Sequence, residues 1–579
     1  MILTASGELD YFKLRSNPAD PAAVILAGIE KAVRRWAGPY EVVHGSTVAT
    51  NALLERKGAR TAFVTTRGFE DLLAIGRQNR SELYNLTPRA RPALIPRELC
   101  FGLRERMLAS GKAAIPPEPV ERLIRQLRRA GVESVAVCFL HSNAHPAHEQ
   151  EVGAKLRRHF AVSLSSEVCG EFREYERAST TAINAYVAPL MQRYLRRLAA
   201  TCPAPLAIMQ SNGGWLSAED AQAHAVRTIL SGPAGGVIGA RELARLAGFP
   251  RVIGLDMGGT STDVSLCDGE VEETTEARID DLPVKVPMLD IVTVGAGGGS
   301  LARIDEGGLL RVGPESAGSR PGPACYGEGD QPTVTDAHVV LGRLRSLLGG
   351  AMPLDVARAR AAVARLGFGV AAGARGIVAV ANSSMEQAIR AISVERGRDP
   401  RDFALLAFGG CAGLHACELA DQLGIRTVLL PEYAGVLSAL GMLLAEPVRD
   451  RSRGVLGNAD YDAVFAALEA GLPAGAIIER TADLRYRGQS YELTVPWKNA
   501  VQRFEAAHER RYGYRLDTPV EVVTLRVRAR SRISPPRLPR RPHRRGRGPA
   551  LLAEYGCTVW IPPGWRYESD PYGTLVVTR

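Results

Sequence analysis

The chain has 579 residues, of which 46% are hydrophobic and 23% are charged, so it can bury several packed cores. No stretch reaches the roughly 18 apolar residues of a membrane helix, and nine scattered cysteines without a C-x-x-C pair exclude a disulfide framework or a cysteine zinc site. The formal net charge of +10 equals the ten arginines between Arg526 and Arg547, where no acid occurs, so the surplus belongs to one segment.

That segment, residues 526–547, also holds four prolines and has no interleaved aromatic residue. These features are typical of a solvated linker, so we expect neither nucleic acid nor a membrane among the partners. A polybasic contact to RNA or to an acidic partner is the alternative. Because the N-terminus has neither a basic n-region nor a long apolar stretch, we expect a cytoplasmic protein.

Apolar strand-like runs alternate with helical stretches along the chain, which predicts an α/β fold. Expected strands are at 61–66, 134–140, 206–209, 252–255, 290–294, 404–408 and 427–430, and expected helices include 120–130, 189–199 and 385–395. From about residue 481 to 527 short strands are expected to predominate. We therefore expect three regions, which are 1–230, 231–445 and a β-rich C-terminal region at 455–579 that contains the 526–547 linker.

His44 is the first candidate site residue along the chain. It ends an expected strand at 41–43 and precedes a turn and a helix that are rich in hydroxyl groups. This position suits a contact to substrate or phosphate, and a turn-capping role fits it equally well. We treat His44 as a candidate catalytic residue.

Two segments, 231–240 and 435–441, are rich in small residues. Small side chains allow two helices to cross at short range, so the pair is expected to form a hinge between two lobes. An ordinary buried helix contact is the simpler alternative for each segment alone.

Residues 256–263 read Asp-Met-Gly-Gly-Thr-Ser-Thr-Asp between two strand-like runs. Glycines let a backbone approach an anion closely, hydroxyls and turn amides supply donors, and aspartates can hold a divalent cation. A Walker loop is excluded, because no Lys precedes the Ser/Thr and a strand follows. The candidates are Asp256 and Asp263 for catalysis, Asp256 for the metal, and Gly258, Gly259, Thr260 and Ser261 for phosphate, although Asp263 could serve only to brace the turn.

Two further glycine-rich turns follow expected strands. The turn at 295–300 lacks the third glycine and the helix of a dinucleotide fingerprint, so a Rossmann site is rejected. Its Gly297 and Gly298 are candidates for phosphate contact, with a tight structural bend as the equal alternative. The turn at 408–413 leads into a helix, and its Gly409 and Gly410 are candidates to border an adenine or ribose.

The order of these elements resembles the superfamily of actin, sugar kinases and heat-shock chaperone ATPases. More narrowly, the chain resembles the hydantoinase A / 5-oxoprolinase family through the strings at 44–58, 173–177, 231–236, 295–300, 320–327 and 335–337. The family ordinarily opens with an Asp-x-Gly-Gly-Thr-x-Thr-Asp hairpin, and no Asp-x-Gly-Gly precedes His44. We therefore expect the first lobe to lack its N-terminal strand and half of the phosphate clamp, through a misassigned start or a truncation.

The resemblance implies a two-lobed ATPase that uses ATP and Mg²⁺. It implies ring-opening hydrolysis of a cyclic amide via a phosphorylated intermediate, with 5-oxoproline of glutathione metabolism or a hydantoin as substrate. The chain would be the A-type subunit of a hetero-oligomer with a hydantoinase B-like subunit. The alternatives are the nucleotide-binding subunit of an acetone- or acetophenone-type carboxylase and a non-catalytic, truncated partner subunit.

Overall fold

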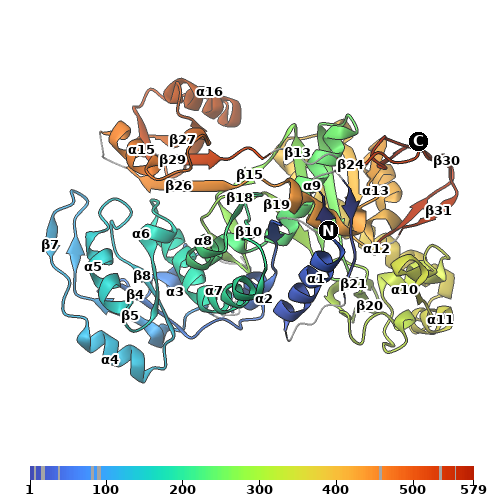
Figure 1. Ribbon diagram of the computed structural model, residues 1–579, viewed down its shortest axis with the longest axis horizontal. Coiled ribbons are helices and arrows are strands. Elements are labelled where there is room, and N and C mark those ends of the chain that lie inside the picture. The colour runs from blue at the N-terminus through green and yellow to red at the C-terminus, as the bar shows by residue number, and fades with distance from the viewer. Residues whose placement is uncertain are drawn as a thin grey trace.

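The computed structural model describes residues 1–4, 8–14, 20–36, 40–79, 84–87, 93–455, 460–533, 538–554 and 556–579. Two lobes lie side by side, and a smaller unit lies above the first lobe in the view of Figure 1. The first lobe contains a four-stranded and a three-stranded sheet, and the second lobe is built on a nine-stranded sheet. The smaller unit, residues 448–530, contains a four-stranded sheet and is called the C-terminal unit below.

The four-stranded sheet of the first lobe is parallel, in the order β5-β4-β8-β9. Every residue of β4 and β8 is buried, as expected for parallel strands that are covered on both faces. The 28-residue helix α7 lies between this sheet and the three-stranded one, because Ala178 and Ala182 belong to one core and Ile183 and Met191 to the other. The elements are β4 (Thr61–Thr66), β5 (Cys100–Leu103), β8 (Ser134–Cys138), β9 (Ala161–Leu164), α4 (Glu121–Arg129), α5 (Ala147–Leu156), α6 (Ser165–Val168) and α7 (Glu174–Thr201).

The three-stranded sheet has the order β11-β10-β3, with β3 (Val42–His44) parallel to β10 (Leu206–Met209) and β11 (Trp215–Ser217) antiparallel to it. Among the described residues, no strand pairs with the other edge of β3, and the missing N-terminal strand stays a prediction. The N-terminal strands β1 (Ile2–Leu3) and β2 (Leu9–Asp10) pair only with each other. Met1, Leu9 and Tyr11 pack instead against a core of the second lobe.

The second-lobe sheet has the order β14-β13-β12-β24-β25-β34-β33-β30, and β19 also pairs with β13. Its two faces bury alternate residues, so that Ile253 and Leu255 join a core with α12 while Val252 joins a core with α9. The strands expected from the sequence at 252–255, 290–294, 404–408 and 427–430 are thereby confirmed. The elements are β12 (Arg251–Met257), β13 (Thr262–Asp268), β14 (Glu270–Val271), β19 (Ile291–Val294), β24 (Ala404–Phe408), β25 (Thr427–Leu430), β30 (Arg545–Arg547), β33 (Arg566–Ser569), β34 (Leu575–Thr578), α12 (Val370–Ile392) and α13 (Ala416–Leu423).

The two small-residue segments form helices α9 (Ser231–Leu246) and α14 (Leu437–Leu444), which cross in direct backbone contact. A Cβ added at Gly235 would lie 2.7 Å from the Ser438 carbonyl oxygen, and one at Gly239 would lie 2.8 Å from that of Leu437. Only glycine therefore fits these two positions, as the sequence predicts. The hinge function remains a prediction.

The expected linker at 526–547 is wrong over its first five residues. Residues 526–530 belong to β29, an inner strand of the C-terminal unit, whose order is β26-β29-β27-β28. Arg526 donates to Glu171 at 2.9 Å and to Asp483 at 2.7 Å, and Arg528 pairs with Asp450 at 2.7 Å. These buried pairs neutralise arginines that would otherwise need solvent.

The remaining linker residues divide between irregular backbone and the edge strand β30, and residues 534–537 lie outside the described part. The expected β-rich region is also not one unit, because β33 and β34 extend the second-lobe sheet while residues 448–530 form the C-terminal unit. A helix, α16, interrupts the stretch where short strands were expected. The unit contains β26 (Val448–Gly454), α15 (Tyr461–Glu469), β27 (Ile477–Tyr486), β28 (Leu493–Pro496), α16 (Ala500–Tyr512) and β29 (Val520–Arg530).

Shorter elements connect these layers. The helices are α1 (Pro21–Arg35), α2 (Val48–Leu54), α3 (Leu72–Ile75), α8 (Ala218–Ala223), α10 (Val334–Val340) and α11 (Val356–Ala364). The antiparallel strand pairs are β6 (Arg106–Met107) with β7 (Ala113–Ile115), β15 (Glu273–Thr274) with β18 (Met288–Leu289), β16 (Ala277–Ile279) with β17 (Leu282–Val284), β20 (Ser300–Ile304) with β21 (Leu310–Ser316), β22 (Ser346–Leu347) with β23 (Met352–Pro353), and β31 (Ala550–Ala553) with β32 (Thr558–Ile561).

Candidate functional site

A cavity of about 440 Å³ opens where the carboxyl ends of β3, β12 and β24 meet the start of α14. His44, Asp256 and Gly409 line it, each at the end of its strand. Ligands of α/β proteins bind preferentially at the carboxyl ends of strands. The structure therefore brings together three residues that the sequence places far apart, and we call this space the interlobe cavity.

Asp256 and Asp263 form the carboxylate pair of the site. They occupy directly opposite positions of the β12–β13 hairpin, so both side chains lie on one face. Burial raises the pKa of Asp256 to about 7, and the Asp263 carboxylate adds to the rise. Burial also raises the pKa of Asp263, although Thr293 Oγ1 donates a hydrogen bond to it at 2.6 Å.

The turn between these two aspartates presents unused donors. The Gly258 amide closes the turn by donating to the Ser261 carbonyl oxygen at 3.0 Å. The amides of Gly259, Thr260 and Ser261 donate to no other described residue, and Gly259 and Thr260 are exposed. A Cβ at Gly259 would meet no atom within 4 Å. Exposed, closely spaced amides of this kind can bind a phosphate group.

The third glycine turn combines one constrained position with one open position. Gly409 has φ +82°, and a Cβ there would lie 2.6 Å from the Met257 carbonyl oxygen and also collide with the Asp256 carboxylate. The neighbouring Gly410 has open space at its Cβ position, and its amide makes no hydrogen bond to a described residue. Gly409 thus fits the turn against β12, while Gly410 faces outward with a free donor.

The turn at 295–300 has a structural role that differs from the predicted one. The Gly298 amide donates to the Gly258 carbonyl oxygen at 3.0 Å, and the Gly297 amide donates to Ser300 Oγ at 2.8 Å. A Cβ at Gly297 would lie 2.6 Å from the backbone of Thr260. Both amides donate hydrogen bonds inside the protein, and the turn packs against the 256–263 hairpin. These contacts favour the tight-bend alternative over the phosphate contact predicted for Gly297 and Gly298.

His44 faces the interlobe cavity as a neutral side chain. Its Nε2 lies 2.7 Å from the Tyr194 hydroxyl, and burial lowers the pKa of His44 to about 4. Burial raises the pKa of Tyr194 to about 12, so the phenol keeps its proton. Tyr194 lies in the C-terminal third of the long helix α7 and belongs to no sequence motif, which explains why sequence analysis does not find it.

The residues of this site fit a hydrated divalent cation. No group of three or more His, Cys, Asp or Glu side chains gathers in the described part of the chain, so a metal cage made by protein alone is absent there. A Mg²⁺ ion is typically held by one or two carboxylates together with water and phosphate oxygens. The half-buried pair of Asp256 and Asp263, without a cationic partner among the described side chains, provides that donor set.

Two general expectations can also be compared with the structure. All nine cysteines are unpaired. Within the described ranges, no helix combines the length and the apolar character that a bilayer crossing requires.

Comparison with known proteins identifies a family. Residues 177–451 match the family model described as Hydantoinase/oxoprolinase, and residues 1–160 match that of the Hydantoinase/oxoprolinase N-terminal region. Caprolactamase subunit alpha of Pseudomonas jessenii is 33% identical over 99% of this chain and 96% of its own length. 5-Oxoprolinase 1 of Arabidopsis thaliana is 35% identical over 82% of the chain, but the match spans only 43% of that relative. Acetophenone carboxylase gamma subunit of Aromatoleum aromaticum is 34% identical over 77% of the chain and 66% of its own length.

Solved structures agree with these relatives. The crystal structure of the ATP-dependent caprolactamase from Pseudomonas jessenii superimposes with a TM-score of 0.86 at 30% identity, covering 100% of this chain and 97% of that one. Nucleotide-free acetone carboxylase gives a TM-score of 0.79 at 24% identity, with coverage of 97% and 95%, and so supports the fold alone. The fold is the predicted two-lobed, mixed α/β arrangement of actin-like ATPases.

Proposed function

Because this chain belongs to the hydantoinase/oxoprolinase family, we propose that it is the nucleotide-binding subunit of an enzyme that uses ATP to open a cyclic amide. The observation that carries the proposal is that Asp256 lines the interlobe cavity, while its hairpin partner Asp263 and the free amides of the turn that joins them belong to the same hairpin. The ATP dependence of the similar caprolactamase from Pseudomonas jessenii also supports the proposal.

Each residue of the cavity has a role in this proposal. Asp256 holds and orients a hydrated divalent cation, and Asp263 shares that charge from the opposite strand. The amides of Gly259, Thr260 and Ser261 hold phosphate oxygens without reorganisation, and Gly410 borders the adenine or ribose. Mg-ATP would supply the phosphoryl group that makes the amide oxygen a better leaving group.

The proposed substrate is a cyclic amide of the 5-oxoproline or hydantoin type. An unstrained amide reacts slowly with water because resonance lowers the electrophilicity of its carbonyl carbon. A neutral His44, placed at the cavity by β3, can donate or accept a hydrogen bond to a polar substrate without adding charge. The lactamase and oxoprolinase names of the relatives support this substrate class.

We also propose that a hydantoinase B-like subunit completes the enzyme as a hetero-oligomer. The chain matches nearly the full length of a protein named as subunit alpha, whereas it matches less than half of 5-oxoprolinase 1. Both facts support a division of the reaction between two polypeptides.

The test is phosphate release by the chain combined with its hydantoinase B-like partner. We expect release to depend on Mg²⁺, ATP and a cyclic amide, with 5-oxoproline, hydantoin and caprolactam compared at equal concentration. Asp256→Asn is expected to abolish the cyclic-amide-dependent release. Failure of the chain to bind Mg-ADP in a calorimetric titration would contradict the proposal and favour a non-catalytic subunit.

A subunit of an acetone- or acetophenone-type carboxylase is the second candidate, favoured by the match to acetophenone carboxylase gamma subunit. The same cavity would then serve an enolate or bicarbonate oxygen in place of an amide oxygen. Phosphate release that requires bicarbonate and a ketone, and does not respond to cyclic amides, would identify this activity.

A further inference from the structure

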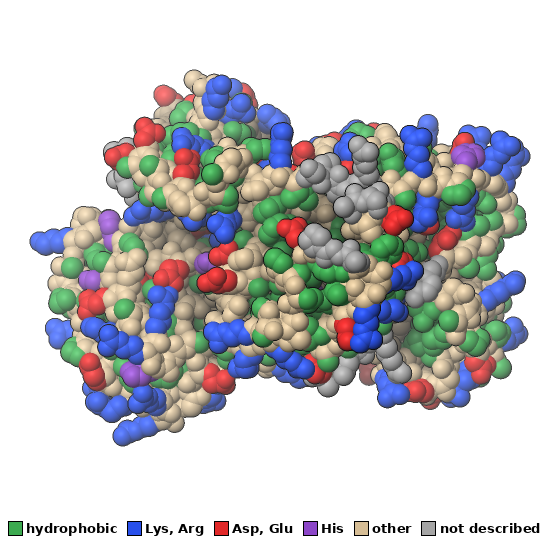
Figure 2. Space-filling view, viewed as in Figure 1, with side chains coloured by type: hydrophobic (Ala, Val, Ile, Leu, Met, Phe, Trp, Pro, Cys, Tyr) green, Lys and Arg blue, Asp and Glu red, His purple; other side chains and the backbone are tan. Residues whose placement is uncertain are grey.

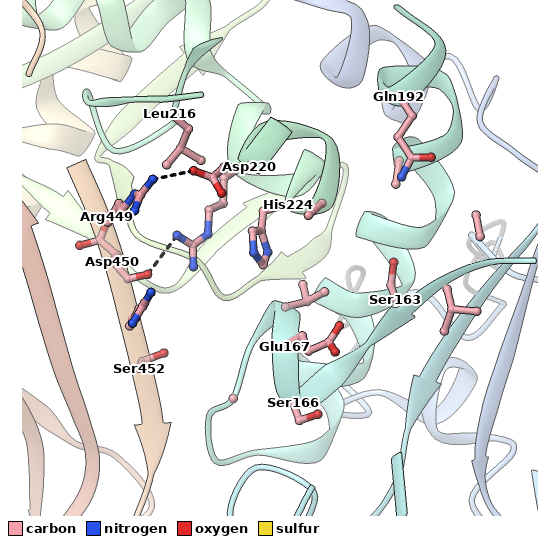
Figure 3. A pocket seen from close by; sticks show the side chains of 18 of the residues that line it. Ser163, Ser166, Glu167, Gln192, Leu216, Asp220, His224, Arg449, Asp450 and Ser452 are labelled. Carbon is pink, nitrogen blue, oxygen red and sulfur yellow. Dashed lines mark hydrogen bonds and ion pairs between the residues drawn. The ribbon is translucent and has the colours of Figure 1, made fainter. Parts of the chain in front are cut away.

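A second cavity, of about 630 Å³, lies between the first lobe and the C-terminal unit. Its walls come from β9 and α6 of the first lobe, from α8 and the turn that follows it, and from β26. Figure 2 shows a hollow between these two parts of the molecule, and Figure 3 shows His224 and Asp220 across the cavity from Ser166 and Glu167. We call it the Arg227 cavity. The two cavities are separate. The interlobe cavity adjoins β3 at one edge of the three-stranded sheet, whereas the Arg227 cavity adjoins β11 at the other edge and the helix α8 that follows β11.

Four arginines and three acidic residues line the Arg227 cavity, and most of their charges are already paired. Arg227 and Arg451 form no ion pair with a described residue. Arg451 already donates to the carbonyl oxygens of Leu468, itself a lining residue, and Ala470, so Arg227 is the arginine with more unused donors. The existing pairs are Arg157 with Glu167, Arg449 with Asp220 at 3.1 Å, and Asp450 with Arg528 at 2.7 Å.

The Arg227 guanidinium has donors to spare. One terminal nitrogen donates to the Asp450 carbonyl oxygen at 3.1 Å, while Nε is buried without a partner. Burial lowers the pKa of Arg227, which reflects a cation that lacks full compensation. The nearby Asp450 carboxylate offsets part of this burial, and a guanidinium that is removed from water is unfavourable unless further groups satisfy it.

Two further buried polar atoms of the cavity have no partner within the described structure, His224 Nδ1 and Ser166 Oγ. Burial, together with the nearby Arg227 charge, lowers the pKa of His224 to about 4. A neutral imidazole and a hydroxyl can both donate a hydrogen bond. His224 and Arg227 come from the segment after α8, and Ser166 comes from α6 on the other side of the cavity.

The rest of the lining is suited to an organic molecule. Val162, Ala188 and Leu216 contribute apolar surface, and the volume lies within the about 300 to 1,000 Å³ of small-molecule sites. A guanidinium fork matches the two oxygens of one carboxylate, whose negative charge complements the Arg227 cation.

We propose that the Arg227 cavity binds a small organic monocarboxylate, with its carboxylate on Arg227 and its apolar part against Leu216. This inference goes beyond the proposed reaction and does not depend on it. A bound carboxylate would contact the first lobe, α8 and β26 together, so it would hold the C-terminal unit against the first lobe and stabilise the protein.

The test uses butyrate as the probe and butyramide as its neutral isostere, with the full chain in calorimetric titrations and thermal unfolding. We expect saturable binding of butyrate, a rise in melting temperature with butyrate, and no effect of butyramide. Arg227→Gln is expected to weaken butyrate binding at least tenfold, and Arg227→Lys, which keeps the charge but loses the fork, should weaken it less. Inorganic phosphate is the competing oxyanion and should bind more weakly than butyrate.

Two further variants separate the cavity from folding and from the nucleotide site. Leu216→Phe narrows the cavity while leaving Arg227 in place, and it should also weaken butyrate binding. Asp256→Asn should bind butyrate like the wild type, so failure of the proposed reaction would leave this result unchanged. Butyrate binding that is absent in the wild type, equal for butyramide, weaker than phosphate binding, or unchanged in folded Arg227→Gln would overturn the proposal.

Discussion

Asp256 and Asp263 lie directly opposite each other across the β12–β13 hairpin, and neither pairs with a cationic side chain among the described residues. Burial raises the pKa of both carboxyl groups, so the folded protein resists holding two negative charges there. A divalent cation would remove that conflict. The first two predictions follow from this pair.

Replacing Asp256 should separate activity from stability. We expect Asp256→Asn to lower substrate-dependent phosphate release at least about 100-fold, because the cation loses its main ligand. The raised carboxyl pKa stabilises the fold below pH 4, and this contribution is lost as the pH rises through about 7. At pH 8 we therefore expect the variant to be at least as stable as the wild type. Its free energy of unfolding should be higher than that of the wild type by at most about 2 kcal/mol. Asp330→Asn, at an exposed ion pair with Arg365, is the matched control and should leave activity unchanged.

Protons should compete with Mg²⁺ for the Asp256 carboxylate. Since the pKa of Asp256 is about 7, about nine tenths of the groups are charged at pH 8 and about one tenth at pH 6. Mg-ADP affinity, measured by calorimetry, should fall about tenfold between these two pH values. In Asp256→Asn, any remaining change of Mg-ADP affinity with pH comes from the titration of the nucleotide itself. An equal change in wild type and variant would assign the effect to the nucleotide.

Adjacent glycines should respond differently to the same substitution. Gly409→Ala places a Cβ at φ +82° against Asp256 and the Met257 carbonyl oxygen, so it should lower the free energy of unfolding by about 2 kcal/mol. Gly410→Ala meets open space and should change stability by less than about 0.5 kcal/mol. Its Cβ would stand where we place the ligand, and Mg-ADP affinity should fall several-fold. Denaturant unfolding and calorimetry measure the two effects, and equal destabilisation by both variants would contradict the assigned orientations.

The buried arginine of β29 should be important for stability. Arg526→Met leaves Glu171 and Asp483 without their shared cation, which should cost about 3 to 5 kcal/mol in denaturant unfolding. Arg515→Gln breaks an exposed pair with Glu509 and serves as the matched control, with a much smaller effect on stability expected. Similar losses in the two variants would show that burial of the Arg526 pairs contributes nothing.

The glycine turns show how far local sequence can locate a site. The hairpin at 256–263 is recognisable because two aspartates, two glycines and flanking strands occur within one short segment. Whether a glycine faces a ligand is not local, since Gly297 packs on Thr260 and Gly410 faces open space, and both positions depend on contacts with distant strands.

The arginine run shows a different limit. Arg526 and Arg528 lie in a segment that is basic and rich in proline, and such composition predicts a solvated linker. Their partners Glu171, Asp450 and Asp483 come from other parts of the chain, so only the folded structure shows that the charges are buried and paired. The Arg227 cavity is not predicted from the sequence for the same reason, because its walls come from segments that are far apart along the chain.

The pairing of β34 with β25 bears on the order in which the molecule is made. Residues 427–430 form one strand of a sheet whose next strand is residues 575–578, so more than a hundred further residues must leave the ribosome before those two edges can meet. The parallel sheet of residues 61–164 needs no later strand and can form while translation continues. During synthesis, the exposed edge of β25 on the nascent chain is therefore a place where a chaperone, or another unfinished copy, could bind.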